Sequence, residues 1–285
     1  MGKSSSIPET LFSFLFIAII SGLLVIFINM RSFAVINHSQ VVISPSYREG
    51  VGEQERIRFG TGEEGFTFNQ ELIANSFPTP KTHKLPLSIA QWQDNSNSGD
   101  YFSEIQKISV GYLIWSQFPI HIHIATPPLT NITQAQAWVN TVSEAVAEWN
   151  KYLPLEIVPQ GNLADIKIIR QAPPLKFDRK LKISRARSAQ TSYHLYTQNN
   201  ILYQRSQILI SPSQTGKYLL AAARHELGHA LGIWGHSPQS SDALYFSQVR
   251  NPPPISPRDV NTLKLIYQQP TSLGWSVNNN NEFIR

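Results

Sequence analysis

The spacing of apolar and polar residues predicts a series of strands and helices in the C-terminal two thirds of the chain. Ile120, Ile122 and Ile124 alternate with His121 and His123, the pattern of a strand with one buried face and two histidines turned toward solvent. By the same reasoning we expect further strands at 155–158 and 164–169, a hairpin of 193–196 and 201–203, and a short buried strand at 208–210.

Three helices follow from apolar residues repeated at helical spacing and from capping residues. The first begins after Asn131, a typical N-cap, and the second covers about 215–231. The third begins with Ser256 as N-cap and Asp259 as the capping-box acid. Strands and helices in this order predict an α+β domain at 108–275.

The N-terminal segment is apolar without any polar face. Residues 11–28 include no charge, and at about 1.5 Å per residue they nearly span a bilayer core of about 30 Å. We therefore expect residues 1–35 to form an uncleaved transmembrane helix, with the rest of the chain outside the cytoplasm, in the periplasm or the extracellular space. The alternative is a signal segment cleaved near 32–34, which would release a secreted protein.

Charge and composition divide the remaining chain. Residues 36–107 contain 6 Lys and Arg against 9 Asp and Glu, and they lack a sustained helical or strand period, which predicts a largely irregular linker or stalk. Residues 108–275 contain 15 Lys and Arg against 8 Asp and Glu, and 276–285 form a C-terminal tail. The absence of cysteine excludes a disulfide scaffold, a thiolate metal site and a cysteine nucleophile.

One short pattern in the second predicted helix points to metal chemistry. His225 and His229 are four residues apart, so a helix places them on the same face, and Glu226 lies close enough to reach a water beside the metal. Gly232 allows the helix to end in a left-handed turn, after which His236 can return as a third nitrogen ligand. Three imidazoles leave a fourth tetrahedral position for water, as in catalytic zinc sites.

This His-Glu-x-x-His-x-x-Gly-x-x-His pattern resembles the signature of the metzincin zinc peptidases, and residues 230–232 resemble its matrixin branch. Residues 118–120, 164–166 and 256–267 resemble the first strand, third strand and C-terminal helix of that branch. The resemblance implies a metzincin-type catalytic domain at 108–275, an α/β sandwich-like α+β fold with a twisted mixed β-sheet and three helices. It also implies a zinc site of His225, His229 and His236 with Glu226 as the general base.

The sequence departs from this family in three ways. Metzincins place a methionine in a tight turn beneath the zinc, but this chain contains only Met1 and Met30. We expect Leu244 to take that place, with Tyr245 beside it in the substrate pocket, since leucine has a similar volume. Without cysteine, latency cannot use the thiolate of a matrixin propeptide. The matrixin loops that bind additional zinc and calcium are not recognisable.

A basic run replaces part of those loops. One interpretation is contact with anionic lipid headgroups or nucleic acid, and the other is a solvated loop beside the active cleft. We favour the solvated loop and expect no nucleic-acid partner. The run comprises Lys176, Arg179, Lys180, Lys182, Arg185 and Arg187, against the single acid Asp178.

These observations predict a membrane-anchored, zinc-dependent endopeptidase whose partners are a protein or peptide substrate and the membrane. The substrate is expected to bind extended, as a strand added to the sheet edge above the cleft. A first alternative is a catalytically silent, zinc-stabilised binding module on a membrane stalk, against which the intact Glu226 argues. A second is a membrane-surface protein that works through the basic run.

Overall fold

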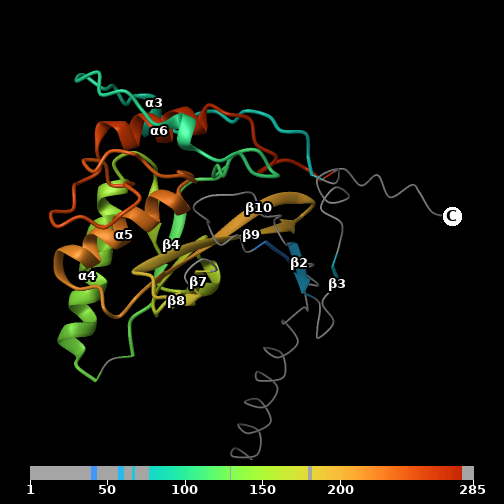
Figure 1. Ribbon diagram of the computed structural model, residues 1–285. Helices are drawn as coiled ribbons and strands as arrows, with labels where there is room; N and C mark the ends of the chain where they lie inside the picture. Colours follow the sequence, from blue (N-terminus) through green and yellow to red (C-terminus); the bar gives the residue numbers. More distant parts are fainter. Residues whose placement is uncertain are drawn as a thin grey trace, which may run out of the picture. The chain divides into compact units, whose positions relative to one another are not determined.

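The computed structural model describes residues 77–128, 130–178 and 182–277, together with the backbone of three short strands nearer the N-terminus. These residues form an α+β fold in which helices pack against a mixed sheet (Figure 1). The expected α+β class is therefore confirmed. The predicted N-terminal anchor and the last eight residues of the predicted tail lie outside the described residues.

The centre of the fold is a five-stranded, mostly parallel sheet. β10 (Ile201–Ile210), β6 (Ile166–Arg170), β4 (Ile120–Ile124) and β5 (Leu155–Ile157) are parallel neighbours in this order, and β9 (Ala189–Gln198) is antiparallel to β10. Beyond β9 the sheet continues with β1 (Gln40–Ile43), β2 (Ile57–Gly60) and β3 (Phe66–Thr67).

The strand predictions are confirmed in position but not always in length. The expected strand at 208–210 is the end of β10, which continues without a break from the predicted hairpin. Side chains along β10 alternate between buried and half-buried over its whole length, but two of the buried ones, Gln204 and Ser206, are polar. The alternation along β10 could not be recognised over its whole length from the sequence, because a strand is predicted from apolar residues at every second position and two of these positions are polar.

The three predicted helices are also confirmed, and a short fourth helix accompanies them. Asn131 caps the first by accepting a hydrogen bond from the backbone N–H of Gln134 at 3.1 Å, and Ser256 and Asp259 form the expected capping box on the last. The helices are α3 (Leu87–Ala90), α4 (Ile132–Trp149), α5 (Gly216–Ala230) and α6 (Pro257–Tyr267).

Helices α4 and α5 lie side by side, and their apolar faces share one core with the sheet (Figure 1). The indole N–H of Trp149, at the end of α4, donates a hydrogen bond of 2.9 Å to the backbone carbonyl of Arg224 on α5. Trp149 is completely buried, so this bond satisfies its only polar group. The contact fixes α5, the helix that carries the histidine pattern, against the rest of the fold.

The boundary at residue 108 is wrong, because residues 77–107 belong to the same packed unit. Ile89, Tyr101 and Ile105 are buried in the core cluster that also contains α4 and α5. The phenol of Tyr101 donates a hydrogen bond of 2.6 Å to Asp259 on α6. Apart from α3 and the single turn η1 (Phe102–Glu104) this stretch is mostly irregular, so its buried side chains have no period to reveal them.

The basic run is exposed where its burial is described in β8 (Ile183–Arg185), as we expected, but part of it forms a strand pair where we expected a loop. β7 (Lys176–Asp178) and β8 form a separate antiparallel pair. On β4, His121 and His123 lie on the face opposite the buried isoleucines, as expected, but both are half-buried and neither joins the histidines of α5. One further helical turn, η2 (Gly161–Leu163), precedes β6.

No helix in the part of the chain that the structure describes is long and apolar enough to cross a membrane.

Candidate metal centre

Two histidines of α5 present their outer nitrogens to the same point. The Nε2 atoms of His225 and His229 are 3.0 Å apart, and two nitrogens at tetrahedral positions around one zinc would be about 3.3 Å apart. His225 Nδ1 lies 2.9 Å from the carbonyl oxygen of Ala243, and His229 Nδ1 lies 2.7 Å from that of Ile233. Because a carbonyl oxygen only accepts, each Nδ1 carries the ring proton and each Nε2 keeps its lone pair for a metal.

Gly232 reverses the chain and brings in the third histidine. Its φ of +126° is a conformation that residues with a side chain rarely adopt, and an added Cβ would lie 2.4 Å from the carbonyl oxygen of Leu113. The expected positive-φ glycine is therefore confirmed, with a close backbone approach as a second reason for it. His225, His229 and His236 offer ligand atoms that all lie within 4.8 Å of one another.

The environment favours the neutral form of His229 and His236, the form that a metal requires. Burial lowers the pKa of His229 well below its usual value, and the positive charges of His225 and His236 lower it further. Burial, with a contribution from His225, also lowers the pKa of His236 to about 3. A neutral imidazole is the form that binds divalent metals, so the residues present fit a metal ion.

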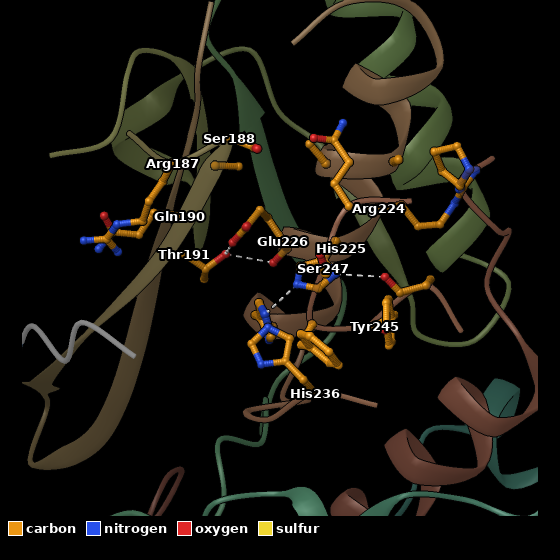
Figure 2. A pocket seen from close by; sticks show the side chains of 18 of the residues that line it. Arg187, Ser188, Gln190, Thr191, Arg224, His225, Glu226, His236, Tyr245 and Ser247 are labelled. Atoms are coloured by element: carbon orange, nitrogen blue, oxygen red, sulfur yellow. Dashed lines mark hydrogen bonds between the residues drawn. The ribbon is translucent and has the colours of Figure 1, made fainter. Parts of the chain in front are cut away.

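Glu226 lies beside the three histidines and is held by a residue from the sheet. Its carboxylate accepts a hydrogen bond of 2.6 Å from the hydroxyl of Thr191 on β9, drawn as a dashed line in Figure 2. Glu226 is only 8% exposed, and burial raises its pKa, while His225, Thr191 and Arg187 oppose that change. Local sequence gave no sign of Thr191, because only the register of β9 brings it to Glu226.

The turn around Leu244 supports α5 from below the histidines. Leu244 is completely buried, and a Cβ added to Gly228 of α5 would lie 2.7 Å from its Cδ2 atom. Ala243, the residue before it, supplies the carbonyl that orients His225. The carboxylate of Asp259 accepts a hydrogen bond of 2.9 Å from the backbone N–H of Ala243. A capping residue of α6 therefore also holds the turn, a second role that its sequence pattern did not indicate.

The histidines open into a cavity of about 430 Å³. The start of β9 with the residues before it lines one side, and the first turns of α5 and residues 245–253 line the others. Tyr245 lines this cavity, where it was expected, and its ring lies 4.4 Å from that of Phe246. A cavity of this size, next to three histidines and a buried acid, is typical of a site that binds a small molecule or a segment of chain.

We predict that Leu244 contributes to stability through its shape. Leu244→Ala is expected to cost about 2–5 kcal/mol, because it removes buried contacts and leaves a cavity beside Gly228, and it should weaken metal binding. Leu244→Met should change stability by less than about 1.5 kcal/mol. Chemical denaturation and a zinc-competition titration of both variants measure this. Unchanged stability and zinc affinity in Leu244→Ala would contradict the prediction.

Comparisons with known protein families and curated proteins identify no relative of this chain. No protein-family model matches the chain, and no curated protein matches it at a significant level. Any conclusion about its activity therefore rests on the residues and the geometry described above.

Proposed function

We propose that this chain is a zinc-dependent endopeptidase with a metzincin-type, matrixin-like catalytic domain. The observation that carries the proposal is the convergence of three histidines beside a buried, hydrogen-bonded glutamate in the wall of a cavity. Three imidazole nitrogens with room for a further ligand are typical of catalytic zinc. We further propose that residues 1–35 anchor the chain in a membrane with this domain outside the cytoplasm.

In this proposal the protein side chains orient the substrate and move the proton. Zinc supplies Lewis acidity, which lowers the pKa of a water ligand to about 7 and polarises a carbonyl oxygen. Glu226 accepts the proton of the attacking water and then delivers it to the leaving amine. The hydroxyl of Thr191 donates to the Glu226 carboxylate, so one of its oxygens is fixed and the other is left for the water.

The edge of β9 offers a place for an extended substrate. On the side of β9 that faces away from β10, the only described neighbouring strand is β1, which pairs with Leu195 and Tyr196. The stretch from Ala189 to Thr191 is therefore without a described partner strand on that side, and it also lines the cavity. A peptide that adds to this edge passes beside Glu226, because Thr191 contacts that residue.

We expect the purified full-length chain to contain about one equivalent of zinc, as a three-histidine site binds one ion. His229→Ala should lose most of this zinc, because it removes one of three converging nitrogens. Elemental analysis measures the metal content, and hydrolysis of a mixture of peptides with and without a chelator measures activity.

His121→Ala is the matched control, since this half-buried histidine on β4 lies outside the site and should leave zinc content unchanged. Full zinc retention in His229→Ala would refute the site. Zinc without hydrolysis of any peptide would instead favour the silent binding module.

A further inference from the structure

Arg187 lines the cavity and belongs to no ion pair between described residues. It is half-buried, and its Nε atom is buried without a hydrogen-bond partner among the described residues. Burial lowers the pKa of Arg187, while the charge of Glu226 opposes that change. A guanidinium in this state is a donor whose hydrogen-bonding capacity is not used within the described part of the chain.

Two other charged residues of the cavity wall, Arg224 and Asp242, have partners within the fold. Arg224 donates to both carboxylate oxygens of Glu148, at 2.5 and 2.8 Å, and to the carbonyl of Pro253. Asp242 is 1% exposed and accepts from Arg258 at 3.0 Å. Of the acids that line the cavity, only Glu226 then remains, and its carboxylate accepts from Thr191. Glu226 is therefore the one described acid of the cavity wall whose charge acts on Arg187, and no ion pair between described residues joins the two.

Gln190 adds a second polar group with unused capacity at the same place. Its Oε1 atom is buried and accepts no hydrogen bond within the described residues. Figure 2 shows Gln190 beside Arg187, on the side of the site where Thr191 lies and away from Arg224. An unpaired donor and an unpaired acceptor side by side are suited to a ligand that carries both a carboxylate and backbone N–H groups, which is the composition of an acidic peptide.

The position of Arg187 along the chain indicates which part of a peptide it would meet. Arg187 precedes Thr191 by four residues, which is about 13 Å along an extended chain. Because the arginine side chain is long, its guanidinium can lie closer to Thr191 than the backbone spacing indicates. A peptide added to the edge of β9 in the commoner antiparallel direction runs with its C-terminal part toward Arg187. With the scissile bond next to Glu226, the residues near Arg187 are those two to four positions after that bond.

We propose that Arg187 selects peptide substrates that carry an aspartate or glutamate two to four residues after the scissile bond. This inference rests on the proposed peptidase function and adds the substrate class. A carboxylate there pairs with a guanidinium whose buried Nε has no hydrogen-bond partner among the described residues, and charge-assisted hydrogen bonds of this kind are stronger than neutral ones.

The test uses the full-length chain and matched peptides. Mass spectrometry first locates the bonds that the wild-type chain cleaves in a peptide mixture. Pairs of peptides that differ only by Asp or Asn at the second to fourth position after such a bond are then compared by kcat/KM. We expect the Asp peptide to be preferred by at least about 10-fold, as for a charged hydrogen bond. Arg187→Ala should abolish the preference, and Arg187→Glu should favour a Lys peptide.

Two further measurements separate selectivity from other roles of Arg187. Lys167→Ala removes one positive charge from the exposed side of β6 and should keep the wild-type preference. The second measurement uses decapeptides that carry a fluorescent label and contain either Asp or Asn at the tested position. Their affinity for the Glu226→Gln chain, which should not cleave them, gives a readout independent of cleavage. If Arg187 only supported Glu226, its loss would slow both peptides equally, and this result would overturn the inference.

The outcomes also distinguish this inference from the proposed function. If no peptide is cleaved, the peptidase proposal fails, and the affinities of Asp and Asn decapeptides of otherwise identical, arbitrary sequence still decide whether Arg187 binds carboxylates. If peptides are cleaved but Asp and Asn peptides have equal kcat/KM, only the substrate inference fails. Salt-sensitive binding to phosphatidylglycerol vesicles that disappears in Arg187→Ala, without any peptide preference, would assign the arginine to a membrane surface and overturn the inference.

Discussion

Replacement of Glu226 by glutamine is expected to lower peptide hydrolysis by at least about 100-fold, the low end of contributions from a general base. Glutamine keeps the size of the side chain and can still accept the hydrogen bond from Thr191, but it cannot take a proton from water. Zinc content and the unfolding midpoint should stay close to those of the wild type. Steady-state kinetics, elemental analysis and chemical denaturation measure the three quantities.

The matched control is Glu144→Gln, the same chemical change at an exposed position on α4. It should leave the rate unchanged. Equal rates for Glu226→Gln and the wild type would show that Glu226 is not the base. A parallel loss of zinc would show instead that the substitution disturbs the histidines, and Thr191→Val would then be the milder probe, because it removes only the hydroxyl that holds the carboxylate.

A chain that begins at residue 108 is expected not to fold cooperatively. It lacks Ile89, Tyr101 and Ile105, each of which is buried, and burial of such side chains is worth about 1.5–3 kcal/mol apiece. It also lacks the phenol that donates to Asp259, the residue that holds the turn before Leu244. These losses approach the whole stability of an ordinary domain, about 5–15 kcal/mol. Near-ultraviolet circular dichroism and denaturant unfolding measure the outcome.

The control is a chain that begins at Ser39, the start of the second of the two compact units into which the chain divides. It should fold, and after a high-salt wash it should be soluble, whereas the full-length chain should remain in the membrane fraction. A cooperatively folded chain from residue 108 would restore the boundary that the composition suggested. Full-length protein in the soluble fraction would count against an uncleaved anchor.

The candidate metal ligands could be recognised from the sequence because their geometry is local. His225 and His229 are brought together by the pitch of a single helix, and Gly232 with its positive φ returns His236 within the next four residues. No contact with a distant part of the chain is needed to predict that three nitrogens converge. The helices could be recognised for the same reason, since caps such as Asn131 act within one turn.

The groups that hold the histidines and Glu226 in place were decided by tertiary structure alone. Thr191 reaches Glu226 only through the register of β9, and Asp259 reaches the backbone of Ala243 only because α6 packs against that turn. The same is true of the boundary of the fold, where Tyr101 is buried from an irregular segment. Such contacts join residues far apart in the chain and follow no period. The sequence therefore determined which residues can bind a metal, and packing decided what orients them and which arginine faces the cavity without a hydrogen-bond partner for its Nε among the described residues.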